Sequence, residues 1–213
     1  MPQQLRVERS LEQAERSTGQ PLSTKYLNLK HELFKQANYW AGAFPGGNDH
    51  GPGHIERVLE KLDQLVGGNP ARQRLLRPYE LFLTMLSILY HDIGILRARE
   101  DHAGISSVYV EEEKKNTYLV DPRDRDIISA AVVSHSSSKD IALETERFSD
   151  EELIGNQSVR PRVIAALVRL ADELDEDFRR AETAVQEKLD LPEASVFYWQ
   201  FCQRVRGIRP DLG

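Results

Sequence analysis

The sequence has few of the features on which several protein classes depend. Only one of its 213 residues is a cysteine, Cys202, so the chain can form neither an internal disulfide nor a zinc site built from several cysteines. A single thiol is typical of a reducing compartment, and we expect Cys202 to have no chemical role. The polar residues 1–20 lack the apolar segment of a signal peptide.

Long hydrophobic runs and an excess of basic residues are also missing. The longest apolar stretch, LFLTMLSILY at 81–90, is too short to span a bilayer. We therefore expect a cytoplasmic protein with no membrane partner. The formal net charge is −6, and no long run of lysine and arginine occurs. This charge disfavours binding to long nucleic acids, which need a basic surface, although it does not exclude a small cationic pocket.

What the sequence does contain is helical periodicity. Apolar residues recur at helical rather than at strand spacing along most of the chain. Glycine-rich and proline-containing breakers divide it into expected helices at 3–17, 23–41, 52–66, 79–92, 102–116, 122–135, 161–180 and 192–205. The polar stretch 136–158 is expected to be a loop or a short mobile insertion. The sequence therefore predicts a single all-α domain over residues 1–213, with roughly eight helices and no internal repeat.

A histidine and an aspartate stand side by side in LYHDIGIL (89–96), at the end of the most apolar helix. Burying His91 and Asp92 there is costly unless a partner compensates. A divalent cation could satisfy both, and imidazole with carboxylate suits Mn, Fe, Zn, Co or Ni. Neighbouring side chains on a helix point about 100° apart, so both reach one ion most easily at a helix end, which Gly94 favours. The simpler alternative is a His–Asp hydrogen bond that only pins helices.

Four further residues occupy comparable places. His54 follows the breaker at 43–53, and Asp172 interrupts the apolar stripe of ALVRLADELD. His102 begins an expected helix, and His135 ends the next one. Packing of these helices would bring the histidines and aspartates together at one centre.

The order H…HD…D resembles that of the HD superfamily of metal-dependent phosphohydrolases. The match includes HIERV around the first histidine, HDIG, and RLADELD around the last aspartate, and it covers about residues 48–180. This resemblance implies an HD-type helical bundle with N- and C-terminal helical extensions. In that superfamily the corresponding residues bind one metal, which assigns this role to His54, His91, Asp92 and Asp172. Members with two metals have further histidines later in the chain. His102 and His135 match these places, which implies that they bind a second metal or phosphate.

The resemblance also implies an activity. It predicts metal-dependent hydrolysis of a phosphoester in a nucleotide or related phosphorylated molecule, by water that one or two ions of Mn, Fe, Zn, Co, Ni or Mg activate. Asp92 and His102 are the expected catalytic residues. Three nearby residues are candidates for contacting substrate or for orienting the ligands: His50, Arg57 and Asp175. Arg179 and Arg180 are expected to be surface or ion-paired residues, and contact with substrate is the alternative for them.

Two departures from the superfamily pattern leave other functions open. Ile95 stands where many members have a lysine, and Ser136 where many have a second histidine. A non-catalytic nucleotide-binding module that signals to an ATPase or effector domain is therefore one alternative. A metal-dependent nuclease acting on short single strands is another. NDHGPGH, HDIGI and RLADELDEDFRR look most like HD domains beside Hsp90-like ATPase modules in bacterial conflict systems, and the abrupt end after RPDLG suits one module of a longer protein.

Overall fold

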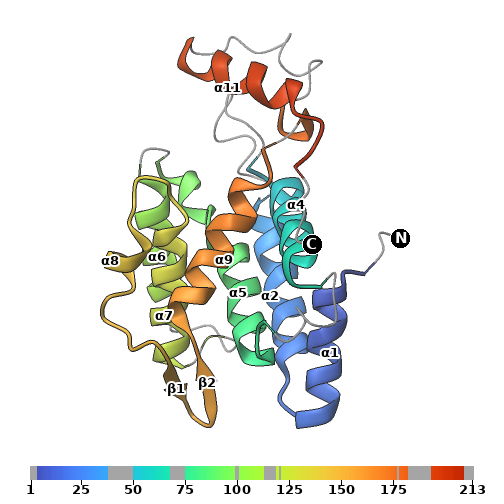
Figure 1. Cartoon of the computed structure of the whole chain (residues 1–213), viewed down its shortest axis with the longest axis vertical. Coiled ribbons are helices and arrows are strands. Elements are labelled where there is room, and N and C mark those ends of the chain that lie inside the picture. The colour runs from blue at the N-terminus through green and yellow to red at the C-terminus, as the bar shows by residue number, and fades with distance from the viewer. Residues whose placement is uncertain are drawn as a thin grey trace.

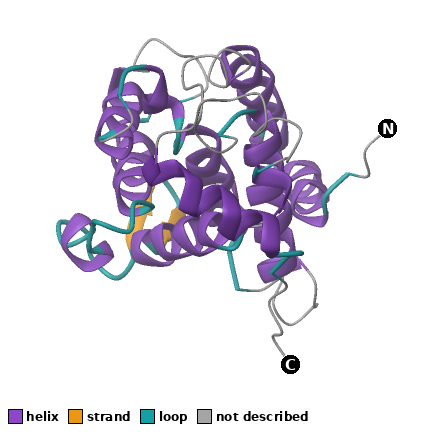
Figure 2. Ribbon diagram, turned by 90° about the horizontal axis from the view of Figure 1, so that it is seen from above, coloured by secondary structure: helices purple, strands orange, loops and turns teal. Residues whose placement is uncertain are grey.

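The computed structural model describes residues 4–37, 50–67, 75–98, 101–112, 119, 121–176, 178–181 and 193–208. Within these residues the chain forms nine α-helices and one small antiparallel sheet (Figure 1). Figure 2 shows that helices account for nearly all of this regular structure and that the two strands occupy one small part of it. The prediction of an all-α helical bundle is confirmed.

Most expected helices have a counterpart with similar bounds. The α-helices are α1 (Arg6–Thr18), α2 (Leu22–Ala37), α4 (Pro52–Leu62), α5 (Pro78–Tyr90), α6 (His102–Glu112), α7 (Pro122–Ser134), α8 (Ile141–Glu144), α9 (Pro161–Glu173) and α11 (Glu193–Arg204). Three short segments with other helical geometry are η1 (Asp63–Gly67), η2 (Ile93–Leu96) and η4 (Phe178–Arg180). The helix expected at 161–180 instead ends at Glu173, and residues 178–180 form the separate segment η4. The expected helical residues 3, 38–41, 113–116, 177 and 192 lie outside the described residues.

Proline marks the start of four helices. Pro52, Pro78, Pro122 and Pro161 each occupy the first turn of α4, α5, α7 and α9. Proline suits this position because its fixed φ matches the helix and its missing N–H would have no helical acceptor there. At α7 the Asp121 side chain also accepts a hydrogen bond from the Arg123 amide at 2.9 Å.

Helix α5 is the centre of the bundle. It contacts α1, α2, α4, α7 and α9 (Figure 1), and every residue from Glu80 to Tyr90 is buried. The helical stretch Pro78–Leu96, which continues past the apolar run 81–90, has the length and composition of a membrane span. However, 89% of its apolar window is buried inside the protein, as in the core helix of a folded domain. Its apolar character therefore serves packing.

A buried carboxylate joins the beginnings of α5 and α9. The two Glu80 oxygens accept hydrogen bonds from the Arg77 amide at 2.8 Å and the Arg160 amide at 2.9 Å. The Arg160 guanidinium also donates to both oxygens, at 2.8 and 2.7 Å. Burial would raise the pKa of Glu80, but the bonds from Arg160 and Arg77 lower it overall. Asp92 follows α5, and Asp172 lies near the end of α9. The Glu80 hydrogen bonds, which join these two helices, therefore help set the distance between Asp92 and Asp172.

The stretch 136–158 is more ordered than the sequence suggested. It contains α8 and the hairpin of β1 (Glu152–Ile154) and β2 (Gln157–Val159), in which Glu152 pairs with Val159. Gly155 adopts a positive φ of 58° at the turn. The prediction of a loop was wrong because each strand has only three residues, too few to reveal the alternation of a strand. The Gly155–Asn156 pair was the available signal for a turn.

Gly94 allows α6 to pack against the segment that follows the HD pair. Its φ is not positive, so it does not end α5 as a left-handed cap. A Cβ atom at this position would instead collide with the His102 carbonyl and lie 2.6 Å from the Ser106 amide nitrogen. The Gly94 amide donates to Ser106 Oγ at 2.8 Å. A side chain at position 94 would therefore push away the helix that carries His102.

We predict that Gly94→Ala lowers the free energy of unfolding by about 1–3 kcal/mol, because backbone atoms must move to admit the methyl group. Gly104→Ala is the matched control, since its Cβ would meet only the end of the Asp101 side chain. That change should be neutral or stabilising by up to about 1 kcal/mol, because alanine favours helix. Chemical denaturation of both variants measures the difference, and equal stability of Gly94→Ala and wild type would contradict the close-packing role.

Candidate metal centre

The structure brings the six predicted metal and phosphate residues together. They come from five places in the bundle, each near a helix end. His54 lies in the first turn of α4, and His91 and Asp92 directly follow α5. The remaining three lie at the start of α6, directly after α7 and near the end of α9, in the order His102, His135 and Asp172. All except His102 and Asp172 are classed as buried.

Four of these residues form a first group of converging atoms. His54 Nε2 lies 3.0 Å from His91 Nε2, 3.4 Å from Asp92 Oδ2 and 3.2 Å from Asp172 Oδ1. His91 Nε2 lies 3.3 Å from the same Asp92 oxygen and 3.7 Å from the same Asp172 oxygen. These are the four residues that the sequence predicts as ligands of one metal.

The other ring nitrogens fix which atoms face the centre. His91 Nδ1 lies 2.7 Å from the Ile88 carbonyl, which can only accept a hydrogen bond, so this nitrogen carries the proton. His54 Nδ1 lies 2.8 Å from Asp175 Oδ2, and the carboxylate is likewise an acceptor. In the neutral rings both Nε2 atoms therefore present lone pairs to each other and to two carboxylate oxygens. A cation or an added proton is needed to offset this repulsion.

The donor set and its spacing fit a divalent metal ion. Atoms bound to one ion at about 2.0–2.2 Å would lie about 2.8–3.6 Å apart, from octahedral to tetrahedral arrangements. The five distances in the first group run from 3.0 to 3.7 Å. Mixed imidazole and carboxylate ligands are those of first-row transition metals, so several ions meet these requirements. These groups could therefore hold a divalent metal ion.

A second group forms around the other oxygen of Asp92. Asp92 Oδ1 lies 3.5 Å from His102 Nε2 and 3.6 Å from His135 Nε2, and the two nitrogens are 3.1 Å apart. His135 Nδ1 lies 2.5 Å from the Val132 carbonyl, so its Nε2 also presents a lone pair. His91 and His135 make an edge contact with ring centroids 5.0 Å apart, which places the two groups side by side. Asp92 thus faces both groups, one oxygen to each.

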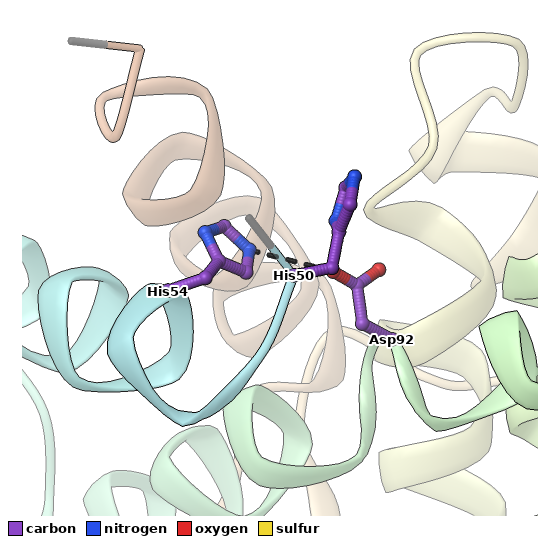
Figure 3. A group of neighbouring side chains, drawn as sticks. All are labelled: His50, His54 and Asp92. Atoms are coloured by element: carbon purple, nitrogen blue, oxygen red, sulfur yellow. Dashed lines mark hydrogen bonds and ion pairs between the residues drawn. The ribbon is translucent and has the colours of Figure 1, made fainter. Parts of the chain in front are cut away.

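His50 is a third histidine close to Asp92. Its Nδ1 lies 2.7 Å from Asp92 Oδ2, the oxygen that also faces the first group. Figure 3 shows His50 before α4, His54 in its first turn, and Asp92 after α5. The His50 side chain is 26% exposed, whereas that of His54 is fully buried. His50 therefore lies on the solvent side of the centre, where it can contact a bound molecule.

Asp175 and Arg57 lie behind His54. Arg57 Nε donates to both Asp175 oxygens, at 3.0 and 3.1 Å, and Asp175 in turn accepts from His54 Nδ1. Such a carboxylate fixes the ring orientation and increases the basicity of the opposite nitrogen. Of the two roles that the sequence left open for these residues, the geometry favours orienting the ligand over contacting substrate.

Four of the six residues reach a cleft of about 370 Å³, whereas His54 and His91 lie buried behind it. His50, Asp92, His102, His135 and Asp172 line it. The two positions that depart from the superfamily pattern, 95 and 136, also line it, with an isoleucine and a serine. Ile95 therefore gives the cleft an apolar surface where a lysine would add a positive charge.

The sequence did not identify the part of the cleft that η4 and α11 contribute. Glu176, Arg180 and Tyr198 line the cleft beside the His/Asp groups. Arg180 forms the expected ion pair, with Glu176. It is not a surface residue, however, because it is only 6% exposed. No short motif marks these residues. The aromatic run FYWQF in the last helix was the available signal.

The charges of the centre shift the pKa values of its members. Burial alone would lower the pKa of His91, but the Asp92 and Asp172 carboxylates and the Ile88 carbonyl raise it to about 9. Burial would raise the pKa of Asp92 and of Asp172, but the surrounding histidines lower both. The pKa of His50 is lowered by burial, against the opposing effect of Asp92. Without a metal, the negative charge of the two carboxylates therefore favours a proton on His91, in place of the cation that would otherwise offset that charge.

Comparison with known families agrees with this geometry. Residues 44–212 match the model of the HD-CE family. The chain belongs to the HD-CE family. The match covers most of the chain and, with the His/Asp cluster, confirms the predicted membership of the HD superfamily. No curated protein and no solved structure gives a match to the chain. The HD-CE match extends through α11, beyond the segment 48–180 that carried the sequence resemblance. The location beside Hsp90-like ATPase modules stays a prediction.

We predict that Asp175→Asn weakens metal binding about 10–100-fold, because His54 loses its charged hydrogen-bond partner. Asp126→Asn, an exposed residue of α7, is the matched control and should bind metal like wild type. Titration of the metal-free proteins with Mn²⁺ by calorimetry measures both. Unfolding of the metal-free forms shows whether the variant is folded, and wild-type affinity in a folded Asp175→Asn protein would refute the orienting role.

We predict that the metal-free HD-CE protein loses stability as the pH rises from 6.5 to 9. The pKa of His91 is about 9, above its ordinary value of 6.5, so protonated His91 stabilises the fold fully below pH 6.5. This contribution, about 3 kcal/mol, disappears as the pH rises through the folded pKa. Urea denaturation in EDTA at several pH values measures it. His91→Gln should abolish the decline, and metal-loaded protein should lack it; an unchanged or rising wild-type stability contradicts the prediction.

Proposed function

We propose that this HD-CE protein is a metal-dependent phosphohydrolase that cleaves a phosphoester of a nucleotide or a related phosphorylated molecule. The position of Asp92 carries this proposal. One Asp92 oxygen lies within 3.4 Å of His54 and His91, and the other lies within 3.6 Å of His102 and His135. Both groups reach a cleft large enough for a small ligand. Membership of the HD superfamily supports the same activity.

A divalent cation, if bound by these groups, would supply a nucleophilic water at neutral pH and would polarise the phosphoryl oxygen. The buried rings of His54 and His91 and the carboxylates of Asp92 and Asp172 would hold one such ion. The Asp92 oxygen that faces His102 and His135 would hold a second. Because Asp175, Ile88 and Val132 fix the rings of His54, His91 and His135, these ligands need little rearrangement.

His102 and His50 are placed to move protons. Their side chains are 24% and 26% exposed, the most accessible among the histidines of the centre, and both line the cleft. His102 Nε2 can give a proton to the leaving oxygen when it is not a ligand. Nε2 of His50, opposite the nitrogen that Asp92 holds, could take the same role. With a single ion bound, Asp92 or a nearby histidine would accept the proton of the attacking water.

Two observations keep a second function in consideration. Ile95 and Ser136 line the cleft at the positions where many HD members have a lysine and a histidine. A cleft with fewer phosphate-binding groups suits a module that binds a nucleotide without turnover and signals to an attached ATPase or effector domain. Binding without phosphate release in metal-loaded protein would support this module over the enzyme.

The test is a hydrolysis panel with metal-loaded protein. We predict that Mn²⁺-loaded wild type releases phosphate or a nucleotide from at least one member of a set of nucleoside phosphates, cyclic and linear dinucleotides, and short single strands. Asp92→Asn should lower kcat/KM at least about 100-fold, because it removes the charge shared by both groups. Asp150→Asn, an exposed residue beyond α8, should leave it unchanged.

The pattern of substrates decides among the candidate functions. Cleavage of single strands alone, with a steep dependence on salt, would favour the nuclease. Absence of turnover across the whole panel in protein that retains bound metal would overturn the enzyme. An Asp92→Asn protein with wild-type kcat/KM would overturn the assignment of the site.

A further inference from the structure

The cleft has one section that the metal-binding groups do not use. It is formed by η4 and α11, which contribute Arg180 and Tyr198, together with Glu176 just before η4. Figure 1 shows α11 beyond the upper ends of α4 and α9, the end of α4 that carries His54. A molecule whose phosphate lies at the His/Asp groups would therefore extend toward α11.

Arg180 is a buried cation with spare hydrogen-bonding capacity. Its side chain is 6% exposed, and Nη1 pairs with Glu176 Oε1 at 2.9 Å. Its Nε has no hydrogen-bond partner among the residues that the structure describes. A buried donor without a described partner is costly. Because Arg180 also lines the cleft, its guanidinium can meet a ligand acceptor there. Of the described residues that line the cleft, Arg180 is the only lysine or arginine.

The acidic surroundings explain why a cation is retained there. The pKa of Arg180 is lowered by burial but raised more by the carboxylates of Asp172, Glu176, Asp175 and Asp92. Each of these charges repels a phosphate that enters the cleft. A guanidinium opposes that repulsion and provides planar donors that match phosphate oxygens, which an ammonium or amide cannot do equally well.

Packing between η4 and α11 holds this section of the cleft in place. Glu176 accepts from Arg180 through Oε1 and from Cys202 Sγ through Oε2, at 3.1 Å. The Phe178 amide donates to the Val205 carbonyl at 3.0 Å. Trp199 and Cys202 of α11 pack with Ala181 in a small apolar cluster. One acidic residue thus connects the cleft cation with the helix that carries Tyr198.

Tyr198 adds an aromatic surface to the cleft. Tyr198 is 56% exposed although it lines the cleft, so much of this large residue remains accessible. Phe197 makes an edge contact with it, with ring centroids 5.7 Å apart. A ring with a free face is a stacking surface for a nucleobase, because every base offers a π-face.

We propose that Arg180 and Tyr198 form a nucleotide-binding subsite in which the guanidinium binds phosphate and the phenol ring stacks on the base. This inference rests on the proposed function, since the bound nucleotide is its substrate or product. The cleft volume of about 370 Å³ lies near the lower end of small-molecule sites, roughly 300–1,000 Å³, which favours a mononucleotide unit over a long strand. Position 180 supplies the positive charge that Ile95 does not.

The test measures binding to Mn²⁺-loaded protein by calorimetry, with phosphate release recorded in parallel. The probes are a panel of nucleoside monophosphates, the matching nucleosides, ribose 5-phosphate, inorganic phosphate and a short single-stranded oligonucleotide. We expect Arg180→Gln to raise Kd at least about tenfold for every phosphate-containing probe. Tyr198→Leu should raise Kd about fivefold or more for nucleotides and nucleosides only, while Tyr198→Phe retains wild-type affinity.

Two neighbouring residues provide matched controls. Arg179 is in the same turn as Arg180, and Phe197 precedes Tyr198, but neither lines the cleft. Arg179→Gln and Phe197→Leu should therefore bind every probe like wild type. Arg180→Gln removes the partner of Glu176, so its folding is checked by circular dichroism. If it is unfolded, Arg180→Lys, which keeps the charge, should still weaken phosphate binding because it loses the planar donors.

Each outcome bears separately on the subsite and on the activity. Wild-type Kd values in folded Arg180 variants or in Tyr198→Leu overturn the subsite, and so does a wild type that binds no probe. Equal losses in Phe197→Leu and Tyr198→Leu for a single-stranded oligonucleotide would also overturn it, in favour of a strand-binding face. Binding that depends on Arg180 and Tyr198 without any hydrolysis supports the subsite and refutes the proposed activity. Hydrolysis by the wild type, together with wild-type Kd values in the Arg180 and Tyr198 variants, supports the proposed activity and refutes the subsite.

Discussion

Four electron-rich atoms meet at the centre of this protein: Nε2 of His54 and of His91, Oδ2 of Asp92 and Oδ1 of Asp172. Hydrogen bonds at the opposite nitrogens leave both imidazoles with lone pairs directed at each other, 3.0 Å apart. In water this crowding would be screened, but a buried site has no such screening. A cation is the group that can satisfy all four atoms, and a proton can do so only in part. The pKa of His91 is raised for the same reason: without a metal, a proton on this ring offsets part of the carboxylate charge.

The rest of the structure holds these atoms together against their repulsion. The core helix α5 delivers the HD pair, and Glu80 ties its beginning to that of α9, which delivers Asp172. Because residue 94 is a glycine, no side chain there holds the helix that carries His102 away from Asp92. Beyond this framework, η4 and α11 complete the cleft, and the HD-CE match includes them. The His/Asp groups and the rest of the cleft lining therefore come from different parts of the chain.

The metal centre was more predictable from sequence than the cleft around it. His91 and Asp92 are adjacent, and each helix carrying another member of the centre shows a polar residue at its end, so local pattern and spacing are informative. Arg57 and Asp175 were named without a settled role, because only the packing of α4 against α9 shows that they pair behind His54. Arg180 was named as a possible substrate contact, but its burial was not predicted, because η4 packs against α11, which is distant in sequence. Hairpin residues 152–159 were missed because strands this short have no detectable period.

The most direct test of the central claim is an anomalous difference map from crystals of the protein grown with Mn²⁺. The account predicts a peak among the four converging atoms of His54, His91, Asp92 and Asp172, with any second peak on the side of Asp92 that faces His102 and His135. A map without a peak at the first position, from protein that has these side chains arranged as described, would contradict it. The centre would then be a network of protonated histidines and carboxylates that only joins the helices.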